Sequence, residues 1–142
     1  PNRREAIVTI VERTSQLLEM KKVERATSRE VAYAIISRLQ SIKAKVHTLT
    51  SDNGSEFAMH EYVARKLDAD FFFARPYSPW QRGLNENTNG LIREYFPKGM
   101  PLGTLSHQDV TKVMKVLNNR PRKTLNYRTP NEIFYADVAL RK

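Results

Sequence analysis

Short apolar runs of strand length alternate with amphipathic segments of helix length along the chain. Residues 6–11, AIVTIV, are rich in β-branched side chains, and a second apolar run covers residues 16–23 after a short polar break, so the pair predicts an antiparallel hairpin. Two more strands are predicted at residues 46–50 and 69–74, with the three phenylalanines at 71–73 in the core. Because helical segments separate the later strands, this order predicts an α/β fold, a mixed sheet flanked by helices.

The predicted helices are recognised by their start signals and by the spacing of their apolar residues. Thr27 and Glu30 form a capping box before an apolar face that continues to Ile42. Ser106 begins a helix near the C-terminal end, and the segment 129–132 combines a capping box with proline at the first helical position. Two further helices are predicted at residues 56–67 and from about 86 to 95, and the proline- and glycine-containing segment 75–84 predicts a loop between them.

The size and charge of the chain narrow the class of partner. Its 142 residues suffice for one domain, so residues 1–142 are predicted to form a single domain. Lys and Arg number 24 against 15 Asp and Glu, which leaves a formal charge of +9 and favours a polyanionic partner such as nucleic acid. No apolar run approaches the ~18 residues that a membrane-spanning helix needs, so no membrane partner is predicted. The absence of cysteine excludes disulfides and thiolate metal sites and is compatible with a reducing cytosol.

Two acidic residues stand out by their local setting. Asp52 follows a predicted strand in a glycine-containing turn, Glu86 opens a predicted helix, and 33 residues lie between them. A strand-end carboxylate and a helix-borne carboxylate could converge on one Mg²⁺, which commonly takes one or two carboxylates together with water and substrate phosphate. Taken singly, each acid favours a structural interpretation, Asp52 as a turn residue and Glu86 as a helix N-terminal acid stabilised by the helix dipole.

The sequence around these acids resembles a known family. The segment LTSDNGSEF (residues 49–57) is similar to the second-aspartate motif of the retroviral-integrase superfamily. PYSPWQRGLNENTNGLIR (residues 76–93) resembles its glutamate motif, in the form used by transposases of the insertion-sequence-thirty family, and NNRPRKTLNYRTPNEIF (residues 118–134) resembles that family's closing signature. The resemblance covers nearly the whole chain, with the motifs in the family's order.

This resemblance implies a ribonuclease-H-like catalytic core with an Asp-Asp-Glu triad that binds two Mg²⁺ or Mn²⁺ ions. Asp52 matches the second aspartate and Glu86 the glutamate, so both are predicted as catalytic metal ligands. The implied activity is DNA transposition, in which a polynucleotidyl transferase nicks DNA and joins the freed 3′-hydroxyl to target DNA. The implied partners are element ends and target DNA, bound by a homo-oligomer, and the implied location is the bacterial cytoplasm, associated with the nucleoid.

The resemblance also indicates what this chain does not contain. In the family, the first aspartate lies on the strand before the one that begins at Ala6, so the first strand is expected to be missing and the catalytic core to be truncated at its N-terminus. Glu5 and Glu12 are the nearest acids, and neither lies in the family's first-aspartate context. The N-terminal helix-turn-helix of the family is absent as well. The chain alone is therefore expected to be inactive, although its parent is an active enzyme.

Residues around the two acids are candidates for DNA contact. They comprise aromatic, amide and basic side chains that could stack on a base or hold a phosphate. Each of these residues could instead have a structural role, as a loop anchor, a helix or turn cap, or a solvated surface charge. The predicted DNA-binding residues are Trp80, Arg82, Asn89, Arg120, Arg122 and Lys123.

Three functional readings of the sequence remain. The leading one is the metal-dependent transposase, and the alternative is a non-catalytic DNA-binding or assembly fragment of such a transposase. The upstream strand would discriminate between these two readings. A ribonuclease H acting on RNA–DNA hybrids would share the metal chemistry, but the transposase-type motifs around Asp52 and Glu86 argue against it.

Overall fold

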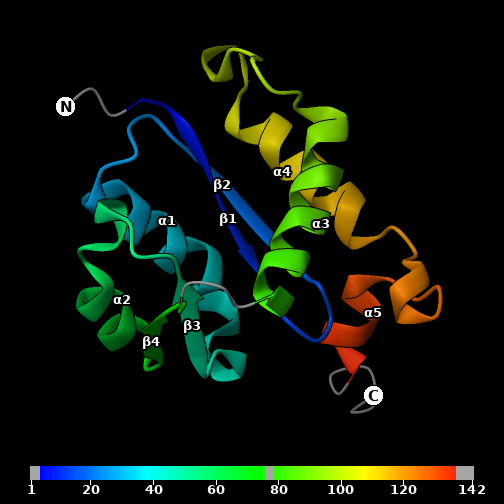
Figure 1. The fold of residues 1–142 in the computed structure, drawn as a ribbon, viewed down its shortest axis with the longest axis horizontal. Coiled ribbons are helices and arrows are strands. Elements are labelled where there is room, and N and C mark those ends of the chain that lie inside the picture. The colour runs from blue at the N-terminus through cyan, green and yellow to red at the C-terminus, as the bar shows by residue number, and fades with distance from the viewer. Residues whose placement is uncertain (1–3, 76–78, 137–142) are drawn as a thin grey trace.

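The computed structural model describes residues 4–75 and 79–136, without the side chains of residues 79–83. An antiparallel hairpin of β1 (Ala6–Val11) and β2 (Leu18–Val23) crosses the middle of the molecule (Figure 1). On one side of it lie helices α1 (Ser28–Leu39) and α2 (His60–Leu67) with the parallel strands β3 (Thr48–Ser51) and β4 (Asp70–Phe73). On the other side lie α3 (Pro79–Tyr95) and α4 (His107–Asn118), followed by the short α5 (Pro130–Phe134). Four 3₁₀ segments connect these elements: Gln40–Lys45, Ser55–Phe57, Leu102–Thr104 and Lys123–Leu125.

Strand β1 contributes side chains to two hydrophobic cores. Ile7 and Val11 pack on the core formed by β2, α3 and α4, whereas Val8 and Ile10 pack on the core formed by α1 and α2. Successive side chains of a strand point to opposite faces, so the largely apolar sequence of β1 places apolar side chains on both faces. The predicted hairpin is therefore confirmed, and β1 joins the two halves of the fold.

The outer edge of β2 is covered by helix α4. The Asn118 side chain lies 4% exposed, accepts a hydrogen bond from the Leu18 amide at 2.9 Å and donates one to the Leu18 carbonyl at 2.8 Å. Two residues along the strand, the Met20 amide donates to the Met114 sulfur at 3.3 Å. Asn118 thus makes the pair of hydrogen bonds that a neighbouring strand would make, and among the described residues no strand adds at this edge.

The strands that the structure describes form two separate two-stranded sheets, where one mixed sheet was predicted. Strand β1 pairs only with β2 and β3 only with β4 among these residues. The physical reason is that a groove lies between β1 and β3, so their facing backbones are not within hydrogen-bonding distance of each other. The mixed α/β class itself is confirmed.

Two local predictions were wrong. Helix α3 begins at Pro79, inside the segment predicted as a loop, because proline suits the first turn of a helix, where its missing amide hydrogen is not needed. In β4, Phe72 is 53% exposed, since alternation along a strand places it opposite the more buried Phe71 and Phe73. The three predicted helix caps are confirmed: Thr27, Ser106 and Thr129 each accept a hydrogen bond from the amide three residues later.

A membrane-spanning helix is not found in the part of the chain that the structure describes: none of its helices is long and apolar enough.

Replacing Asn118 with alanine removes both hydrogen bonds to Leu18 and leaves a buried amide and carbonyl unsatisfied. Each such group costs about 1–3 kcal/mol, so Asn118→Ala is expected to lower the free energy of unfolding in urea by about 3 kcal/mol. Gln108→Ala, at an exposed position of the same helix, should change it by less than about 0.5 kcal/mol. Equal effects of the two substitutions would show that β2 does not depend on this contact.

Candidate active site

A groove of about 990 Å³ lies where the two small sheets meet the start of helix α3. One wall is the end of β1 with the turn that follows it, and the opposite wall is strand β3 with the residues after it. Helix α3 contributes the lining residues Leu84, Asn85, Glu86 and Asn89. Phe134 of α5 also lines the groove. The groove therefore collects side chains from segments that are far apart in the sequence.

Asp52 lies at the carboxyl end of β3, in the wall of this groove. Its side chain is exposed and accepts a hydrogen bond from the Gly54 amide at 3.1 Å, which holds the carboxylate beside the turn. Glycine at position 54 leaves room for the Glu56 carboxylate, because a Cβ there would overlap it in its present position and lie 3.0 Å from the Asp52 carboxylate oxygen. The turn chemistry predicted from the sequence thus keeps Asp52 out of the core.

Glu86 reaches the same groove from helix α3. Asn85, Glu86 and Asn89 are exposed and line the groove, whereas Thr88 is buried on the other face of the helix. Residues three and four positions apart lie on one side of a helix, which explains why these three side chains share the groove. The structure places Asp52 and Glu86 in the walls of one groove and Asn89 beside Glu86.

Two further acids line the groove from the β1–β2 hairpin. Glu12 accepts hydrogen bonds from the Thr14 and Ser15 amides at 2.8 and 2.9 Å; burial acts to raise the pKa of its carboxyl, but these hydrogen bonds outweigh it and lower the pKa below the ordinary 4.5. Burial raises the pKa of Glu19, which the Arg38 guanidinium at 3.4 Å opposes. Among the described residues, no group of three or more acids or histidines lies close enough to hold a metal ion. Both hairpin acids are thus engaged in structural contacts.

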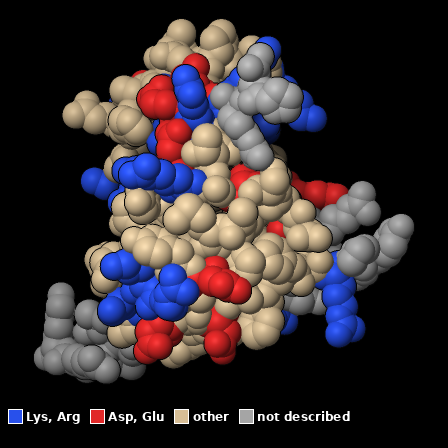
Figure 2. Space-filling view, turned by 90° about the vertical axis from the view of Figure 1, so that its left-hand side faces the viewer, with Lys and Arg blue, Asp and Glu red and all other residues tan. Residues whose placement is uncertain are grey.

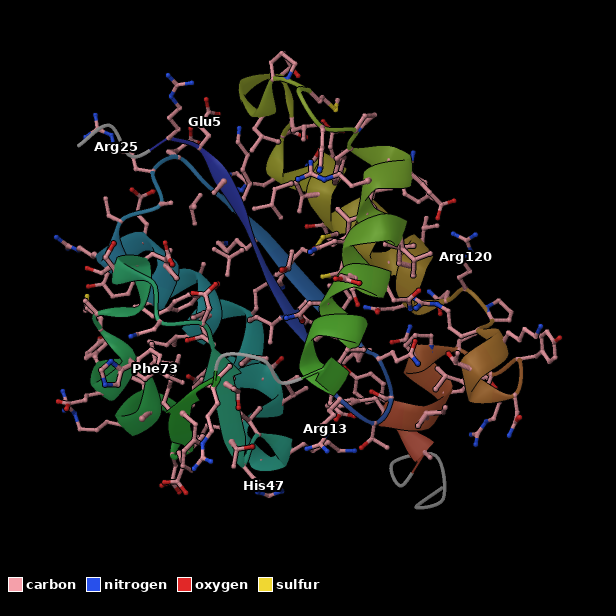
Figure 3. The ribbon with its side chains drawn as sticks, in the orientation of Figure 1. Glu5, Arg13, Arg25, His47, Phe73 and Arg120 are labelled. Atoms are coloured by element: carbon pink, nitrogen blue, oxygen red, sulfur yellow. The ribbon has the colours of Figure 1, made fainter. Side chains whose placement is uncertain are left out.

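Two exposed basic residues of the groove were not predicted from the sequence. Arg13 follows β1, Arg75 follows β4, and both are exposed residues that line the groove. Figure 3 shows Arg13 at the end of the hairpin near α5. The order of strand, helix and strand over residues 46–74 was the available signal for Arg75, since it favours parallel pairing. The ends of the parallel strands β3 and β4 meet at one edge, which places Arg75 near Asp52.

The predicted DNA-binding residues have different environments. Asn89 lines the groove, and the side chains of Trp80 and Arg82 lie outside the described residues. Arg120 points outward at the edge of the molecule and pairs with Glu94 at 3.3 Å (Figure 3). Lys123 is exposed.

Arg122 requires a correction, because it is 8% exposed and its guanidinium faces the protein interior. One nitrogen donates to the Leu117 carbonyl at 2.8 Å and another to the Gln16 side chain at 3.4 Å. Burial, together with the charge of Arg120, lowers the pKa of Arg122 from its ordinary value. Arg122 therefore holds the chain in place after α4, and we do not propose it as a phosphate contact.

Comparison with known proteins identifies the relatives of this chain. No family model matches it. The transposase for insertion sequence element IS4351 of Bacteroides fragilis is 44% identical over 133 residues, which is 94% of this chain and 41% of that protein. The transposase InsI for insertion sequence element IS30A of Escherichia coli K12 is 41% identical over 135 residues, 94% of this chain and 35% of that protein. The homologues of this chain are IS30-family transposases.

The fold matches a solved integrase structure. The catalytic core domain of BIV integrase superposes with a TM-score of 0.74 over 95% of this chain and 88% of that one, at 24% sequence identity. The ribonuclease-H-like, integrase-type fold implied by the sequence motifs is thereby confirmed. This chain spans 41% of the length of the first of these transposases and 35% of the length of the second.

Substituting Glu12 tests whether its ionised carboxylate stabilises the turn after β1, which forms part of the groove wall. Because its folded-state pKa lies below the unfolded value, ionised Glu12 stabilises the protein above about pH 4.5, and this stability is lost as the pH falls through the folded-state pKa. Glu12→Gln is expected to lower the free energy of unfolding by about 1.5 kcal/mol at pH 7, as is typical of hydrogen bonds to charged groups. The difference from the unsubstituted chain should shrink as the pH falls below 4.5.

Urea titrations at a series of pH values measure this difference. The matched control is Glu61→Gln, which removes an exposed carboxylate of α2. A destabilisation by Glu12→Gln that does not change with pH would contradict the role of the ionised carboxylate.

Proposed function

We propose that this chain forms most of the catalytic domain of a DNA transposase, and that Asp52 and Glu86 are its metal ligands. The single observation that carries the proposal is that these two carboxylates, from the end of β3 and from α3, line one groove. The relatives of the chain are transposases, and its fold is that of an integrase catalytic core, which supports DNA as the substrate.

The donor set suits Mg²⁺ or Mn²⁺. Both ligands are carboxylates, and Asn85 and Asn89 add amide oxygens at the same wall of the groove. Mg²⁺ accepts such hard oxygen ligands and keeps the rest of its coordination for water and phosphate. When bound, divalent ions would supply activation of the attacking oxygen and stabilisation of the leaving oxygen of a phosphodiester. The protein residues would fix the ion positions, and Arg13 and Arg75 would hold the DNA phosphates beside them.

We further propose that the groove receives a strand from outside residues 1–142, and that this strand carries the third carboxylate. The end of β1 and the whole of β3 border the groove, and neither has a strand partner on that side among the described residues. A strand inserted between them would continue both ladders at the usual spacing of about 4.8 Å. The 142-residue chain alone is then expected to be inactive.

The alternative function is a non-catalytic DNA-binding or assembly fragment. It is favoured by the absence, among the described residues, of a third acid close enough to complete a metal site. In that case the groove would bind DNA without cleaving it. Assembly of a homo-oligomer on DNA stays a prediction under both readings.

A nicking assay with Mg²⁺ or Mn²⁺ and a DNA end of the parent element tests the catalytic proposal. The 142-residue chain is compared with a chain extended at its N-terminus by the proposed strand. Only the extended chain is expected to nick DNA. Asp52→Asn or Glu86→Gln should reduce nicking by the extended chain at least roughly 100-fold, because metal-based charge stabilisation contributes several kcal/mol and about 1.4 kcal/mol is tenfold in rate.

Glu61→Gln, which removes an exposed acid of α2, is the matched control and should leave the rate unchanged. Nicking by the short chain at the rate of the extended one would contradict the proposed strand. Glu12→Gln and Glu19→Gln would then show whether a hairpin acid serves as the third ligand. Full activity of both the Asp52 and Glu86 variants would contradict the metal site itself.

Binding of duplex DNA without metal tests the two groove arginines. Affinity is expected to fall steeply with salt and to depend little on sequence, since phosphate contacts release counterions. The double variant Arg13→Ala, Arg75→Ala should reduce the slope of log affinity against log salt by about 2, or about 1 for each phosphate that is no longer neutralised. Arg29→Ala, on α1 beside Tyr33, is the control. An unchanged slope in the double variant would exclude the groove as the phosphate-binding surface.

A further inference from the structure

The segment between α4 and α5 presents an exposed aromatic ring on an unusual backbone. Tyr127 is 70% exposed, more than any other large hydrophobic residue that the structure describes. Its φ is 64°, and that of the preceding Asn126 is 55°. Asparagine tolerates this left-handed region, but a bulky aromatic residue is strained there by about 1 kcal/mol or more. Among the described residues this conformation brings the ring no burial, so the ring is open to a partner outside the chain.

The loop that carries this ring, residues 122–128, is held firmly by Arg122. The Arg122 amide donates to the Arg128 carbonyl at 3.0 Å, and the Arg122 carbonyl accepts from the Tyr127 amide at 2.8 Å. The buried Arg122 guanidinium anchors the loop to the end of α4 through the Leu117 carbonyl. The exposed position of Tyr127 therefore follows from a set of hydrogen bonds on both sides of the loop.

The charged residues that flank Tyr127 in the sequence are basic. Lys123 and Arg128 are exposed, and the sequence has no acid between residues 120 and 131. On the α1 and α2 side of the molecule, by contrast, basic and acidic side chains alternate over the surface (Figure 2). An exposed aromatic ring between cations fits a strand of nucleic acid, because the ring can stack on any base while the cations neutralise phosphates.

The loop adjoins the wall of the groove. The Gln16 side chain donates to the Thr124 hydroxyl at 2.9 Å and accepts from Arg122 at 3.4 Å. Gln16 belongs to the turn after β1, whose Glu12 and Arg13 line the groove. One side of this turn thus faces the groove and the other side holds the loop.

We propose that the 122–128 loop is a second DNA contact of the transposase, in which Tyr127 stacks on an unpaired base while Lys123 and Arg128 bind the flanking phosphates. The proposal rests on the function proposed above, because it takes DNA as the ligand of the groove. It adds a single-stranded segment of DNA beyond the groove, on the side of α5. The contact needs no metal ion.

Binding of a single-stranded oligonucleotide that contains 2-aminopurine, measured with EDTA present, tests this contact. Stacking on Tyr127 should quench the fluorescence of the base analogue. Tyr127→Ala is expected to abolish the quenching and to weaken binding roughly 5- to 100-fold without changing the salt slope, whereas Tyr127→Phe should keep both. Lys123→Ala with Arg128→Ala should instead reduce the salt slope by about 2. Tyr33→Ala, at a 46% exposed tyrosine of α1, is the matched control.

Tyr127→Gly removes the ring and relieves the positive φ, so it should bind as weakly as Tyr127→Ala while unfolding at the same or a higher temperature. It provides the binding test even if the alanine variant is unstable. Unchanged affinity and quenching in the glycine variant would overturn the loop contact and leave the metal-site proposal standing. A change in oligomeric state at unchanged DNA affinity would overturn it in favour of a contact between copies of the chain.

Discussion

Strand β1 is the element on which the two halves of the structure depend, because each of its faces packs, partly buried, against a different core. Ile7 and Val11 pack toward α3 and α4, whereas Val8 and Ile10 pack toward α1 and α2. A polar residue on either face of the strand would weaken one core, and a shift of register by one residue would exchange the two sets of side chains. The relative position of Asp52, which follows β3, and Glu86, on α3, therefore depends on a strand that carries neither.

The two edges of the hairpin are treated differently. At β2, the Asn118 side chain makes the hydrogen bonds to Leu18 that a neighbouring strand would make. The Met114 sulfur accepts a hydrogen bond from the Met20 amide at the same edge. At β1, the end of the edge that faces away from β2 borders the groove instead. An edge of unpaired backbone groups is a pairing site for another strand. Because Asn118 covers the edge of β2 and the end of the β1 edge lies beside the groove, only the β1 side is open to a further strand among the described residues. This agrees with our proposal that a strand inserts there.

The sequence predicts the strands and the capped helices well, because apolar spacing and cap residues are local signals. It also predicts the environment of Asp52, since SDNG after a strand favours a turn, and the Gly54 amide of that turn donates to the Asp52 carboxylate. It does not predict the start of α3, where Pro79 fits a loop or a first helical turn equally well. The groove, and with it Arg13 and Arg75, depends on the spacing of two separate sheets, which no local pattern specifies. The resemblance to transposases supplied the pairing of Asp52 with Glu86, because spacing alone leaves both open to structural roles.

Arg122 and Lys123 show why a basic cluster cannot be interpreted from its sequence alone. They are neighbours in the chain, yet Arg122 is buried and Lys123 is exposed. Arg122 is buried because its guanidinium donates a hydrogen bond to the Leu117 carbonyl at the end of α4. Arginine suits this position because its fork of donors bonds to Leu117 and Gln16 at the same time, and lysine would reach only one of them. The buried cation fixes the loop, and the fixed loop displays Lys123, Tyr127 and Arg128. Since Gln16 also belongs to the turn in the groove wall, a change at Arg122 would alter the loop and the groove together, although Arg122 itself touches neither DNA nor metal in our proposal.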